Sequence, residues 1–271
     1  MNIRYVGNGT VRLISGGGKI YTDIAARFCR SEKSMENIIA SDYDAELVRK
    51  IVDSGHKAAT EFDYFIFGVE GYARVTETQL VRKRLASYLI KSGRAEKGGK
   101  RSFDAVLPET VLPHTAQISL PADRFFAEGK PLSQLISAKE VSLSLSAQDI
   151  LSMIEIWYNK GVEEGYKEEE LRYLKPQATE FKAIIGMNAH ALNDWFMIRC
   201  CQNAQTEIRD LADKMLRLCK EAAPALFENA GPSCKVLGYC PENRMQNEKC
   251  KGRIFTKDQA MEILKDYRKN K

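Results

Sequence analysis

The sequence predicts an α+β fold, because segments with helical periodicity surround one segment with the alternation of a strand. Apolar residues recur at steps of three and four over 19–30, 43–54 and 147–165, which is typical of helices with one buried face. Apolar side chains alternate along 61–71, which is typical of a half-buried strand. No internal repeat and no linker rich in proline and serine interrupts the chain, so we expect one main domain.

The first part of the chain predicts two helices, a strand and a third helix. Ser41 and Asp42 precede the helix 43–54 and can cap its N-terminus. The strand 61–71 ends at a glycine, and we expect a helix to follow over about 76–91. The prediction of that helix depends on apolar residues that recur at steps of three and four: Leu80, Val81, Leu85, Tyr88 and Leu89.

The middle of the chain is less regular. The stretch 95–145 shows no lasting period, so we expect a mobile loop near 95–103 and irregular or short helical segments after it. Ser146 and Asp149 have the spacing of a capping box in front of the helix 147–165.

The last part of the chain predicts helices separated by loops. A short helix over 168–174 must stop before Pro176, because a proline cannot continue it. The longest helix is expected over 180–221, and a loop segment over 228–254. A capping-box sequence then opens a last helix over 256–269.

Composition is that of an ordinary globular protein, with 44% hydrophobic and 28% charged residues. We expect a domain over 1–230 and a C-terminal tail with a terminal helix over 231–271. The net charge of +5 suits an anionic small molecule as well as nucleic acid. No apolar run approaches the length of a membrane span, and Met1–Arg4 does not begin a signal peptide, so we expect a cytoplasmic protein without membrane contact.

Seven cysteines divide into two groups. Those in helical patterns, where a reduced and buried thiol is usual, are Cys29, Cys200, Cys201 and Cys219. Those in the tail are Cys234, Cys240 and Cys250, and five and nine residues separate them. These spacings match no standard zinc pattern. Reduced thiols in a flexible tail are therefore the favoured interpretation, a metal site is the weaker alternative, and no metal ligand is predicted.

The densest group of candidate binding residues lies within 74–94. Its cations and hydroxyls are Arg82, Lys83, Arg84, Ser87, Lys91, Ser92 and Arg94. Gly93 lets backbone N–H groups approach a ligand, and the guanidinium of Arg94 is planar and two-pronged. The group therefore suits a phosphate. The alternative is a solvated basic helix that ends at a glycine cap.

A second candidate group lies on the predicted helix 180–221. One face carries Asn188, Leu192, Trp195 and Arg199. A face with leucine and tryptophan should be buried, so its amide and guanidinium need partners. Arg199 either pairs with a carboxylate for structural reasons or lines a ligand groove. His190 and Asp194 are four residues apart on an adjacent face and can pair with each other.

The order of residues in the basic block resembles the signature of the flavin-dependent thymidylate synthases. That signature is Arg-His-Arg, two residues, Ser, one residue, Asn, two residues, Ser, one residue, Arg. The corresponding positions here are Arg82, Lys83, Arg84, Ser87, Leu89, Ser92 and Arg94. Lys83 and Leu89 replace the family's His and Asn, whereas Gln79 and the two residues after it match the sequence upstream.

Other blocks agree with the same family in spacing. Arg199 stands eleven positions after Asn188, a spacing that resembles the family's, and an Ala-Gln-x-Glu-Ile stretch follows at 204–208. Arg172 stands sixteen residues before Asn188 and precedes a proline, again as in the family. His56 resembles the histidine of the family's Gly-His segment. The resemblance covers about residues 10–230.

Members of this family methylate dUMP at C5 to give dTMP. Methylenetetrahydrofolate supplies the carbon, and NADPH reduces the bound FAD. The resemblance therefore implies a domain of mixed helices and antiparallel sheet that binds dUMP and FAD. It also implies a homotetramer whose active sites are shared between subunits.

The resemblance also implies site residues. Those for substrate would be Gln79, Arg82, Ser92, Gly93, Arg94, Arg172 and Arg199. Those for the flavin cofactor would be His56, Arg82, Lys83, Arg84, Asn188 and His190. Arg94 would clamp the phosphate, and Arg199 would act in catalysis by favouring ionisation of the pyrimidine at N3. As an alternative, His56 would simply cap the helix before it.

The departures from the family pattern leave other functions open. Lys83 keeps a cation but lacks a flat ring that could stack on a flavin, and Leu89 removes an amide. Either the site is retuned for a related substrate, or catalysis is weakened or lost. One alternative is a divergent flavoprotein that acts on another pyrimidine nucleotide. The other is a non-catalytic module for nucleic acid, which is disfavoured because aromatics do not interleave with the cations.

Overall fold

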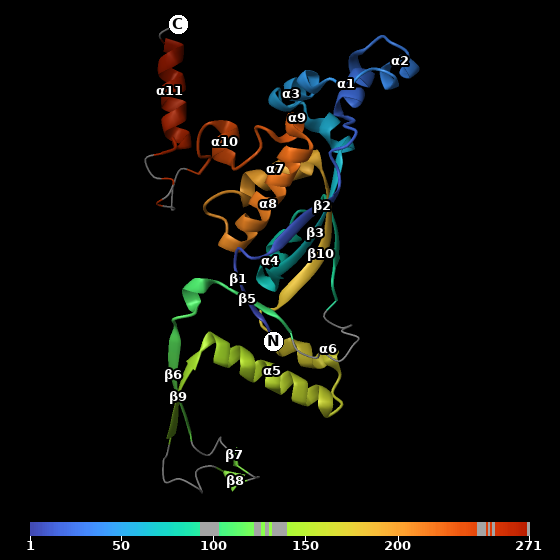
Figure 1. The fold of residues 1–271 in the computed structure, drawn as a ribbon. Coiled ribbons are helices and arrows are strands. Elements are labelled where there is room, and N and C mark those ends of the chain that lie inside the picture. The colour runs from blue at the N-terminus through green and yellow to red at the C-terminus, as the bar shows by residue number, and fades with distance from the viewer. Residues whose placement is uncertain are drawn as a thin grey trace. The chain divides into compact units, whose positions relative to one another are not determined.

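The computed structural model describes residues 1–92, 103–121, 126–127, 130–131, 140–242, 248, 250 and 253–269 (Figure 1). The chain forms two compact units. The smaller unit consists of Met1–Val6 and Ser92–Glu180, and the larger consists of Gly7–Lys91 and Phe181–Lys271. The chain therefore starts in the smaller unit, enters the larger one, returns, and ends in the larger one.

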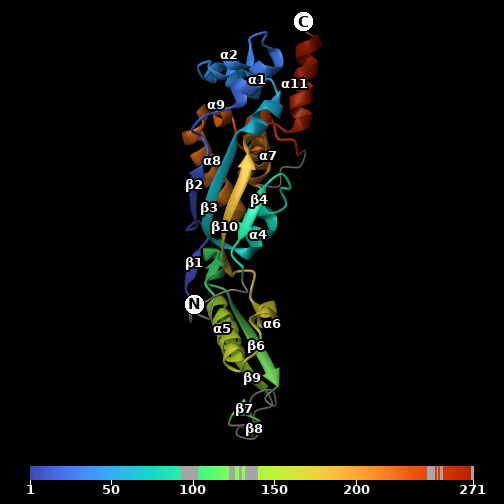
Figure 2. The same cartoon turned by 90° about the vertical axis from the view of Figure 1, so that its right-hand side faces the viewer.

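A four-stranded sheet forms the centre of the larger unit. Its strands, in spatial order, are β2 (Thr10–Ser15), β3 (Tyr64–Ala73), β10 (Glu180–Asn188) and β4 (Ser87–Ile90) (Figures 1 and 2). The pairs β2–β3 and β10–β4 are antiparallel. Burial alternates along most of β3, so the predicted strand and its period of two are confirmed, with Phe65, Phe67 and Val69 turned into the core.

Helices complete the larger unit. They are α1 (Thr22–Arg30), α2 (Met35–Ile39), α3 (Ala45–Asp53), the 3₁₀ helix η1 (Lys57–Phe62), α4 (Arg74–Leu80), α7 (Ala189–Arg199), α8 (Thr206–Ala222), α9 (Pro224–Phe227), α10 (Ser233–Leu237) and α11 (Lys257–Lys269). Asp44, rather than Ser41 or Asp42, caps α3, because its carboxylate is next to the first turn and accepts from the Leu47 N–H at 2.9 Å.

The core of the larger unit lies where α7, α8 and α9 pack with the sheet. Phe196 and Phe227 are fully buried, and the ring of Phe227 meets that of Phe65 edge-on at a centroid distance of 5.2 Å. Ile185 of β10 and Leu192 of α7 join the same cluster. The amphipathic helix α8 therefore owes its position to the apolar face that it buries.

The predicted helix over 76–91 is wrong in its second half. Helix α4 ends at Leu80, and Ser87–Ile90 form β4, in which Leu89 pairs with Ile184 of β10. The apolar steps of three and four after Leu80 span a turn and a strand. Pairing with β10 satisfies the backbone groups of β4 that face it, which outweighs the local preference for helix.

The predicted helix over 180–221 is also wrong. Its first part is β10, in which Phe181, Ala183 and Ile185 are buried alternately with exposed Lys182 and Ile184. This period of two is visible in the sequence but short. The remainder is divided between α7 and α8 by a turn.

The described part of the smaller unit combines strands with four helical segments. Strands β1 (Ile3–Tyr5) and β5 (Ala105–Leu107) are parallel, and β6 (Thr115–Pro121) pairs antiparallel with β9 (Glu140–Ser146). The remaining elements are η2 (Glu109–Val111), β7 (Phe126–Ala127), β8 (Lys130–Pro131), α5 (Ala147–Glu163), α6 (Glu168–Leu171) and η5 (Arg172–Leu174). The mixed composition of both units confirms the predicted α+β class.

Residues 95–145 depart from the sequence prediction of irregular or short helical segments. Strands β5, β6 and β9 occupy much of the described part, because the alternation of serine with leucine and valine along 141–146 suits a strand. Apart from Phe103, the predicted loop near 95–103 lies outside the described residues. The capping box of α5 is confirmed, with Ser146 and Asp149 each accepting from the other's backbone N–H.

The C-terminal tail contains more structure than the predicted loop, since α10 lies within it. The capping box of α11 is confirmed: the Thr256 N–H donates to Gln259 Oε1 at 2.9 Å, and the Gln259 N–H donates to Thr256 Oγ1 at 3.2 Å. The division at residue 230 stays a prediction. Across the described residues, no helix has both the length and the apolar character needed to cross a membrane.

A buried carboxylate connects the end of β3 and the start of α4 to α8. Glu207 of α8 is 1% exposed and accepts from the Ala73 N–H at 2.8 Å and from the Thr76 hydroxyl at 2.6 Å. Burial raises the pKa of Glu207, and the hydrogen bonds from Thr76 and Ala73 oppose this effect. The position of α4 therefore depends on Glu207.

We expect Glu207→Ala to destabilise the protein by about 2–4 kcal/mol, because two buried donors lose their acceptor. Since the pKa of Glu207 is higher in the folded protein, the protonated acid favours folding. This contribution is complete below the unfolded-state pKa and is lost as pH rises through the folded-state value. Glu207→Gln should therefore flatten the loss of stability between acidic and neutral pH, as measured by urea unfolding. An unchanged pH dependence in Glu207→Gln would contradict this explanation.

Candidate functional site

The three adjacent cations predicted for the site lie in the turn between α4 and β4. Arg82 and Arg84 are exposed, whereas Lys83 is half-buried. The Nε atom of Arg82 donates to the Thr78 carbonyl at 3.4 Å. Because α4 has already ended, the cations are not on a helix, and the predicted alternative of a solvated basic helix is not what the structure shows.

Tyr88 of β4 fixes this turn. Its hydroxyl lies 2.9 Å from the Leu80 carbonyl and 3.0 Å from the Lys83 carbonyl, so one proton is shared between two acceptors. Burial raises the pKa of Tyr88 to about 12 despite the opposing effect of Arg199. The phenol is therefore protonated at neutral pH and remains a donor to the turn.

Lys83 belongs to a line of four ionisable side chains that also contains Asp194, His190 and Glu61. Its Nζ lies 3.3 Å from Asp194 Oδ2, and the same oxygen lies 3.8 Å from His190 Nε2. On the other side of the ring, His190 Nδ1 is 3.2 Å from Glu61 Oε1. The predicted pairing of His190 with Asp194 is thus confirmed, and the tertiary structure adds a partner at each end.

Arg199 is held at the C-terminal end of α7. Its Nη2 donates to the Gln79 carbonyl at 3.0 Å, and the Gln79 amide donates to Gln205 Oε1 at 3.3 Å. Burial, with Arg82 as the next cause, lowers the pKa of Arg199. In the described part of the chain its hydrogen bond goes to this carbonyl, not to the carboxylate predicted as one alternative. Leu192 and Trp195 on the same helix are buried as predicted.

Asn188 has a structural role that its sequence position did not reveal. It is the N-cap of α7, and its Oδ1 accepts from the Ala191 N–H at 2.8 Å. Asn188 and Arg199 therefore mark the two ends of this helix, which at 1.5 Å per residue is roughly 15 Å long. A ligand that touched both would have to extend along α7.

His56 does not cap the preceding helix. Helix α3 ends at Asp53 with Ser54 as its C-cap, and Gly55 follows with a φ of +79°. His56 is exposed and comes immediately before η1 without donating a capping bond from its side chain. The capping alternative is therefore wrong, and the histidine is accessible beside the element that carries Glu61.

The predicted site residues are divided between the two units. Arg172 belongs to η5 of the smaller unit, and Ser92 is the first residue of that unit's second segment. Gly93 and Arg94 lie outside the described residues. The predicted phosphate cradle thus stays a prediction, whereas Gln79, the three cations and the α7 residues share the larger unit.

Some residues that shape the site gave no sequence signal of their own. The Tyr64 hydroxyl donates to Ser87 Oγ at 3.1 Å, which connects β3 to β4. The ring of Tyr64 lies over Gly186 of β10, where an added Cβ would come within 2.6 Å of the hydroxyl oxygen. A larger residue there would displace the tyrosine ring. These residues, and Glu61 as the partner of His190, are neighbours solely through the sheet and its packing.

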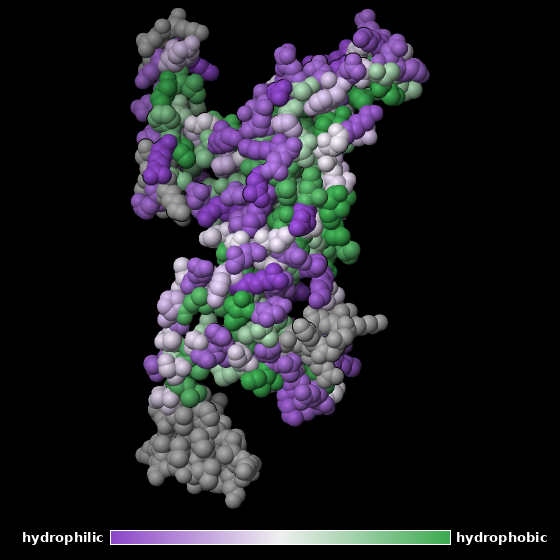
Figure 3. Space-filling view, viewed as in Figure 1, coloured by the Kyte–Doolittle hydropathy of each residue, from purple (hydrophilic) through white to green (hydrophobic). Residues whose placement is uncertain are grey.

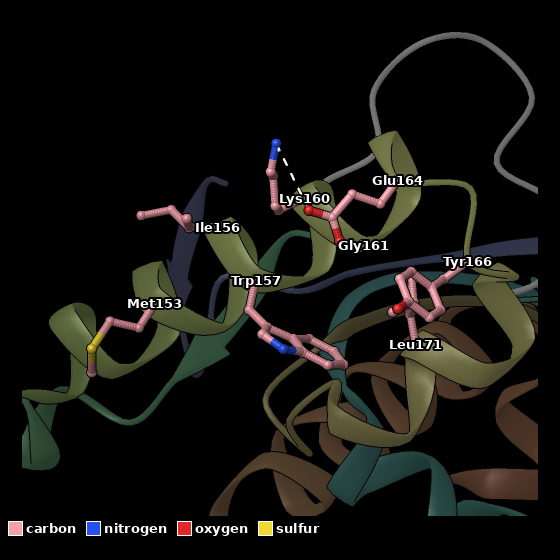
Figure 4. Close-up of a pocket in the computed structure, with 8 residues that line it drawn as sticks. All are labelled: Met153, Ile156, Trp157, Lys160, Gly161, Glu164, Tyr166 and Leu171. Atoms are coloured by element: carbon pink, nitrogen blue, oxygen red, sulfur yellow. Dashed lines mark ion pairs between the residues drawn. The ribbon is translucent and has the colours of Figure 1, made fainter. Parts of the chain in front are cut away.

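A separate cavity of about 620 Å³ lies in the smaller unit between α5 and the segment that leads to α6 (Figure 4). It is lined by Met153, Ile156, Trp157, Lys160, Gly161, Glu164, Tyr166 and Leu171. Lys160 and Glu164 are ion-paired at 3.9 Å. None of the predicted site residues lines it. Hydrophobic residues also break the hydrophilic surface elsewhere on both units (Figure 3).

Comparison with known proteins identifies the family. The model of the family described as thymidylate synthase complementing protein matches residues 18–225. A flavin-dependent thymidylate synthase from Geobacter sulfurreducens is 36% identical over 226 residues, which cover 82% of this chain and 85% of that protein. Its counterpart from Clostridium tetani is 36% identical over 233 residues, with 82% and 85% covered.

A solved structure supports the fold. The UMP/dUMP methylase PolB from Streptomyces cacaoi, bound with 5-Br dUMP, superimposes with a TM-score of 0.63 at 20% identity. The match covers 84% of this chain and 96% of that one. At this identity the likeness concerns the fold alone, whereas the family model and the relatives rest on the sequence. The chain belongs to the flavin-dependent thymidylate synthases, a family of enzymes.

Proposed function

We propose that the protein is an FAD-dependent thymidylate synthase, which methylates dUMP to dTMP with methylenetetrahydrofolate as carbon donor and NADPH as reductant. The family match over residues 18–225 carries this proposal. The site geometry supports it, because Arg82, Arg84 and the half-buried Arg199 lie in one unit, and burial followed by the charge of Arg82 lowers the pKa of Arg199. Such a group of fixed cations suits a nucleotide.

The residues present fit a cofactor that carries phosphates. Arg82 and Arg84 are exposed in the turn after α4, while Lys83 is oriented by Asp194. These three cations, with Asn188, His190 and His56, would hold FAD. A bound flavin would supply the redox chemistry of methyl transfer. Since Lys83 is already paired with a carboxylate, Arg82 and Arg84 would neutralise most of the phosphate charge.

The substrate would be bound by Gln79, Arg82, Ser92, Gly93, Arg94, Arg172 and Arg199. Arg199 is the proposed catalytic residue, because a cation fixed near the base lowers the cost of ionising N3. Its hydrogen bond to the Gln79 carbonyl restricts the guanidinium before any ligand arrives. Because the side chain is already restricted, less conformational entropy is lost when a ligand binds.

A second candidate function is methylation of another pyrimidine nucleotide by the same fold. Lys83 and Leu89 depart from the family signature, and the solved structural neighbour is a methylase of both UMP and dUMP. Leu89 is 73% exposed on β4, so the family's amide is replaced by an accessible apolar side chain. Assays should therefore include UMP beside dUMP. We also propose the homotetramer implied by the resemblance, which sedimentation would test.

We expect the purified protein to bind FAD, and Arg84→Ala to weaken binding by about 1.5–3 kcal/mol through loss of one charge-assisted contact. Titration followed by flavin absorbance and fluorescence measures this loss. Arg217→Ala, which removes an exposed cation from α8, is the matched control and should leave the affinity unchanged. A protein that takes up no flavin from excess FAD would refute the assignment.

Arg94 and Arg199 should affect dUMP differently. Phosphate contacts are equal in the ground and transition states, so Arg94→Ala should raise the Kd for dUMP with little change in kcat. Arg199→Ala should also lower kcat, on the order of 10²-fold, because it removes charge stabilisation at the base. Equal losses of affinity with unchanged turnover in both variants would contradict these roles.

The departures from the family signature should modulate thymidylate synthesis without abolishing it. We expect dTMP formation from dUMP, methylenetetrahydrofolate, NADPH and FAD, and a higher rate in the double variant Lys83→His, Leu89→Asn. Asp194→Asn should alter flavin affinity while changing stability by only about 0–1 kcal/mol, since the ion pair is partly exposed. Glu46→Gln, which removes the exposed pair with Lys50, is the control. A native protein that binds both ligands yet forms no dTMP would shift the assignment to the second candidate.

A further inference from the structure

The line of four ionisable side chains joins three elements of the larger unit that are distant in the sequence. Lys83 comes from the turn after α4, His190 and Asp194 come from α7, and Glu61 comes from η1. All four side chains are partly exposed, from 20% for Lys83 to 55% for Glu61. We call these four residues the charge line. It is accessible to a ligand from solvent, and it begins in the turn that carries the predicted cofactor cations.

Each acid of the charge line holds one side chain that the family resemblance assigns to the cofactor. Asp194 Oδ2 lies 3.3 Å from Lys83 Nζ, so the ammonium group of a flexible side chain is fixed. Glu61 Oε1 lies 3.2 Å from His190 Nδ1 and restricts the imidazole ring, although 129 positions separate the two residues. The sequence assigned no cofactor role to either acid. Both are placed to act on a ligand through the lysine and the histidine.

The protonation state of His190 decides the net charge of the charge line. Glu61 and Asp194 are acids, Lys83 is a cation, and His190 is charged only when its ring is protonated. The line is therefore neutral when the ring is protonated and carries one net negative charge when the ring is neutral. Histidine is the side chain that changes charge between about pH 5 and pH 8. The charge presented to a ligand thus depends on pH in the physiological range.

The groups around His190 act on its charge in both directions. Glu61 of η1 and Asp194 of the same helix favour the protonated ring, because each places a negative charge beside one ring nitrogen. The cations of the turn oppose protonation, and among them Lys83 shares Asp194 with the ring. The positive end of α7 also opposes it, since His190 lies in the first turn of that helix. Within the described ranges no other carboxylate forms an ion pair with His190.

A ligand that carries a diphosphate would respond to this charge. The phosphates of FAD are fully ionised throughout the neutral pH range, so the charge of the ligand itself stays constant. A charge line with a net negative charge repels them, whereas a neutral line does not. A protonated His190 also competes for Asp194, which leaves more of the charge of Lys83 to the ligand.

A purely structural role explains the charge line poorly. Exposed ion pairs contribute little to stability, because water screens the attraction and ordering two side chains costs entropy. The ion pairs of Asp194 and Glu61 are of this exposed kind. An arrangement that joins three elements on the surface of the larger unit and ends beside Arg82 and Arg84 is better explained by a ligand that needs oriented cations.

We propose that Glu61 and Asp194 are positioning residues of the cofactor site, and that the site takes up a proton on His190 when FAD binds. The inference rests on the proposed function, because it takes the diphosphate of FAD as the anionic group. Protonation of His190 makes the charge line neutral and favours the anion. The bound anion favours the protonated ring to the same extent, because linkage between two binding events is reciprocal. Lys83 stays charged throughout, so His190 is the proton-sensitive member of the charge line.

Titration of the full chain with FAD at a series of pH values, followed by flavin fluorescence, tests this proposal. The Kd for FAD should rise on the order of three- to tenfold from about pH 6 to about pH 8. His190→Arg, whose charge is fixed, should keep the low Kd throughout, and His190→Gln should keep the high Kd. His114→Gln removes an exposed histidine of the smaller unit and should retain the native pH dependence, as should His56→Gln. Riboflavin, which lacks phosphates, should bind without pH dependence.

The two acids have a test of their own. Glu61→Gln and Asp194→Asn should each shift the midpoint of the pH dependence to lower pH, because the protonated ring loses a neighbouring negative charge. Glu46→Gln, which removes the exposed partner of Lys50, should leave the midpoint unchanged. Since the chain contains three histidines, their NMR signals can be assigned by substitution. Addition of FAD near neutral pH should move the His190 signals toward those of the protonated ring.

The outcomes distinguish this inference from the proposed function. A protein that binds no FAD at any pH would refute both. Equal affinity for FAD at both ends of the pH range, or a pH dependence that survives in His190→Gln, would overturn this inference alone. If the variants do not fold, as judged by circular dichroism, calorimetric titration of the native protein with FAD in two buffers of different ionisation enthalpy decides. Uptake of a fraction of a proton near neutral pH supports the proposal, and no uptake overturns it.

Discussion

The buried carboxylate of Glu207 is the interaction on which the candidate site depends. By accepting from the Ala73 N–H and the Thr76 hydroxyl, it fixes the start of α4 against α8. Helix α4 in turn positions Gln79, whose backbone carbonyl accepts a hydrogen bond from the guanidinium of Arg199 on α7. A carboxylate is tolerated in the core because strong donors replace its hydration. The unfavourable cost of burying it remains visible as a raised pKa, so stability and site geometry are linked through one residue.

Several cations of the candidate site have an acidic side chain beside them. Lys83 has Asp194 beside it, and His190 stands between two carboxylates. Burial and then Arg82 lower the pKa of Arg199, and the opposing effect comes from Tyr88. An anionic ligand would therefore gain most from the two arginines. The charge of Lys83 in the turn is matched by Asp194 on α7.

The sequence alone determined several elements because their signals are local. The alternation around Phe65 and Phe67, and the capping boxes of α5 and α11, involve residues close together in the chain, and the structure confirms them. The pair His190–Asp194 is equally local, since four residues bring two side chains to one side of a helix. The family was also readable, because its signature is a matter of order and spacing that needs no coordinates.

Only the tertiary structure decided which element forms after Leu80 and which residues surround Cys201. Apolar residues at steps of three and four suited a helix over 76–91. Residues 87–90 instead form a strand, because their backbone groups pair with the edge of β10. The alternation of buried and exposed residues in β10 spans few residues, so the helical pattern of the residues that follow dominated the sequence prediction. Likewise, the consecutive Cys200 and Cys201 are alike in sequence, and packing alone sends one to α8 and the other toward the tail. Local patterns fix what a segment can form, whereas contacts between distant segments select among those options, because unpaired backbone and apolar groups must be satisfied by whichever neighbour the fold supplies.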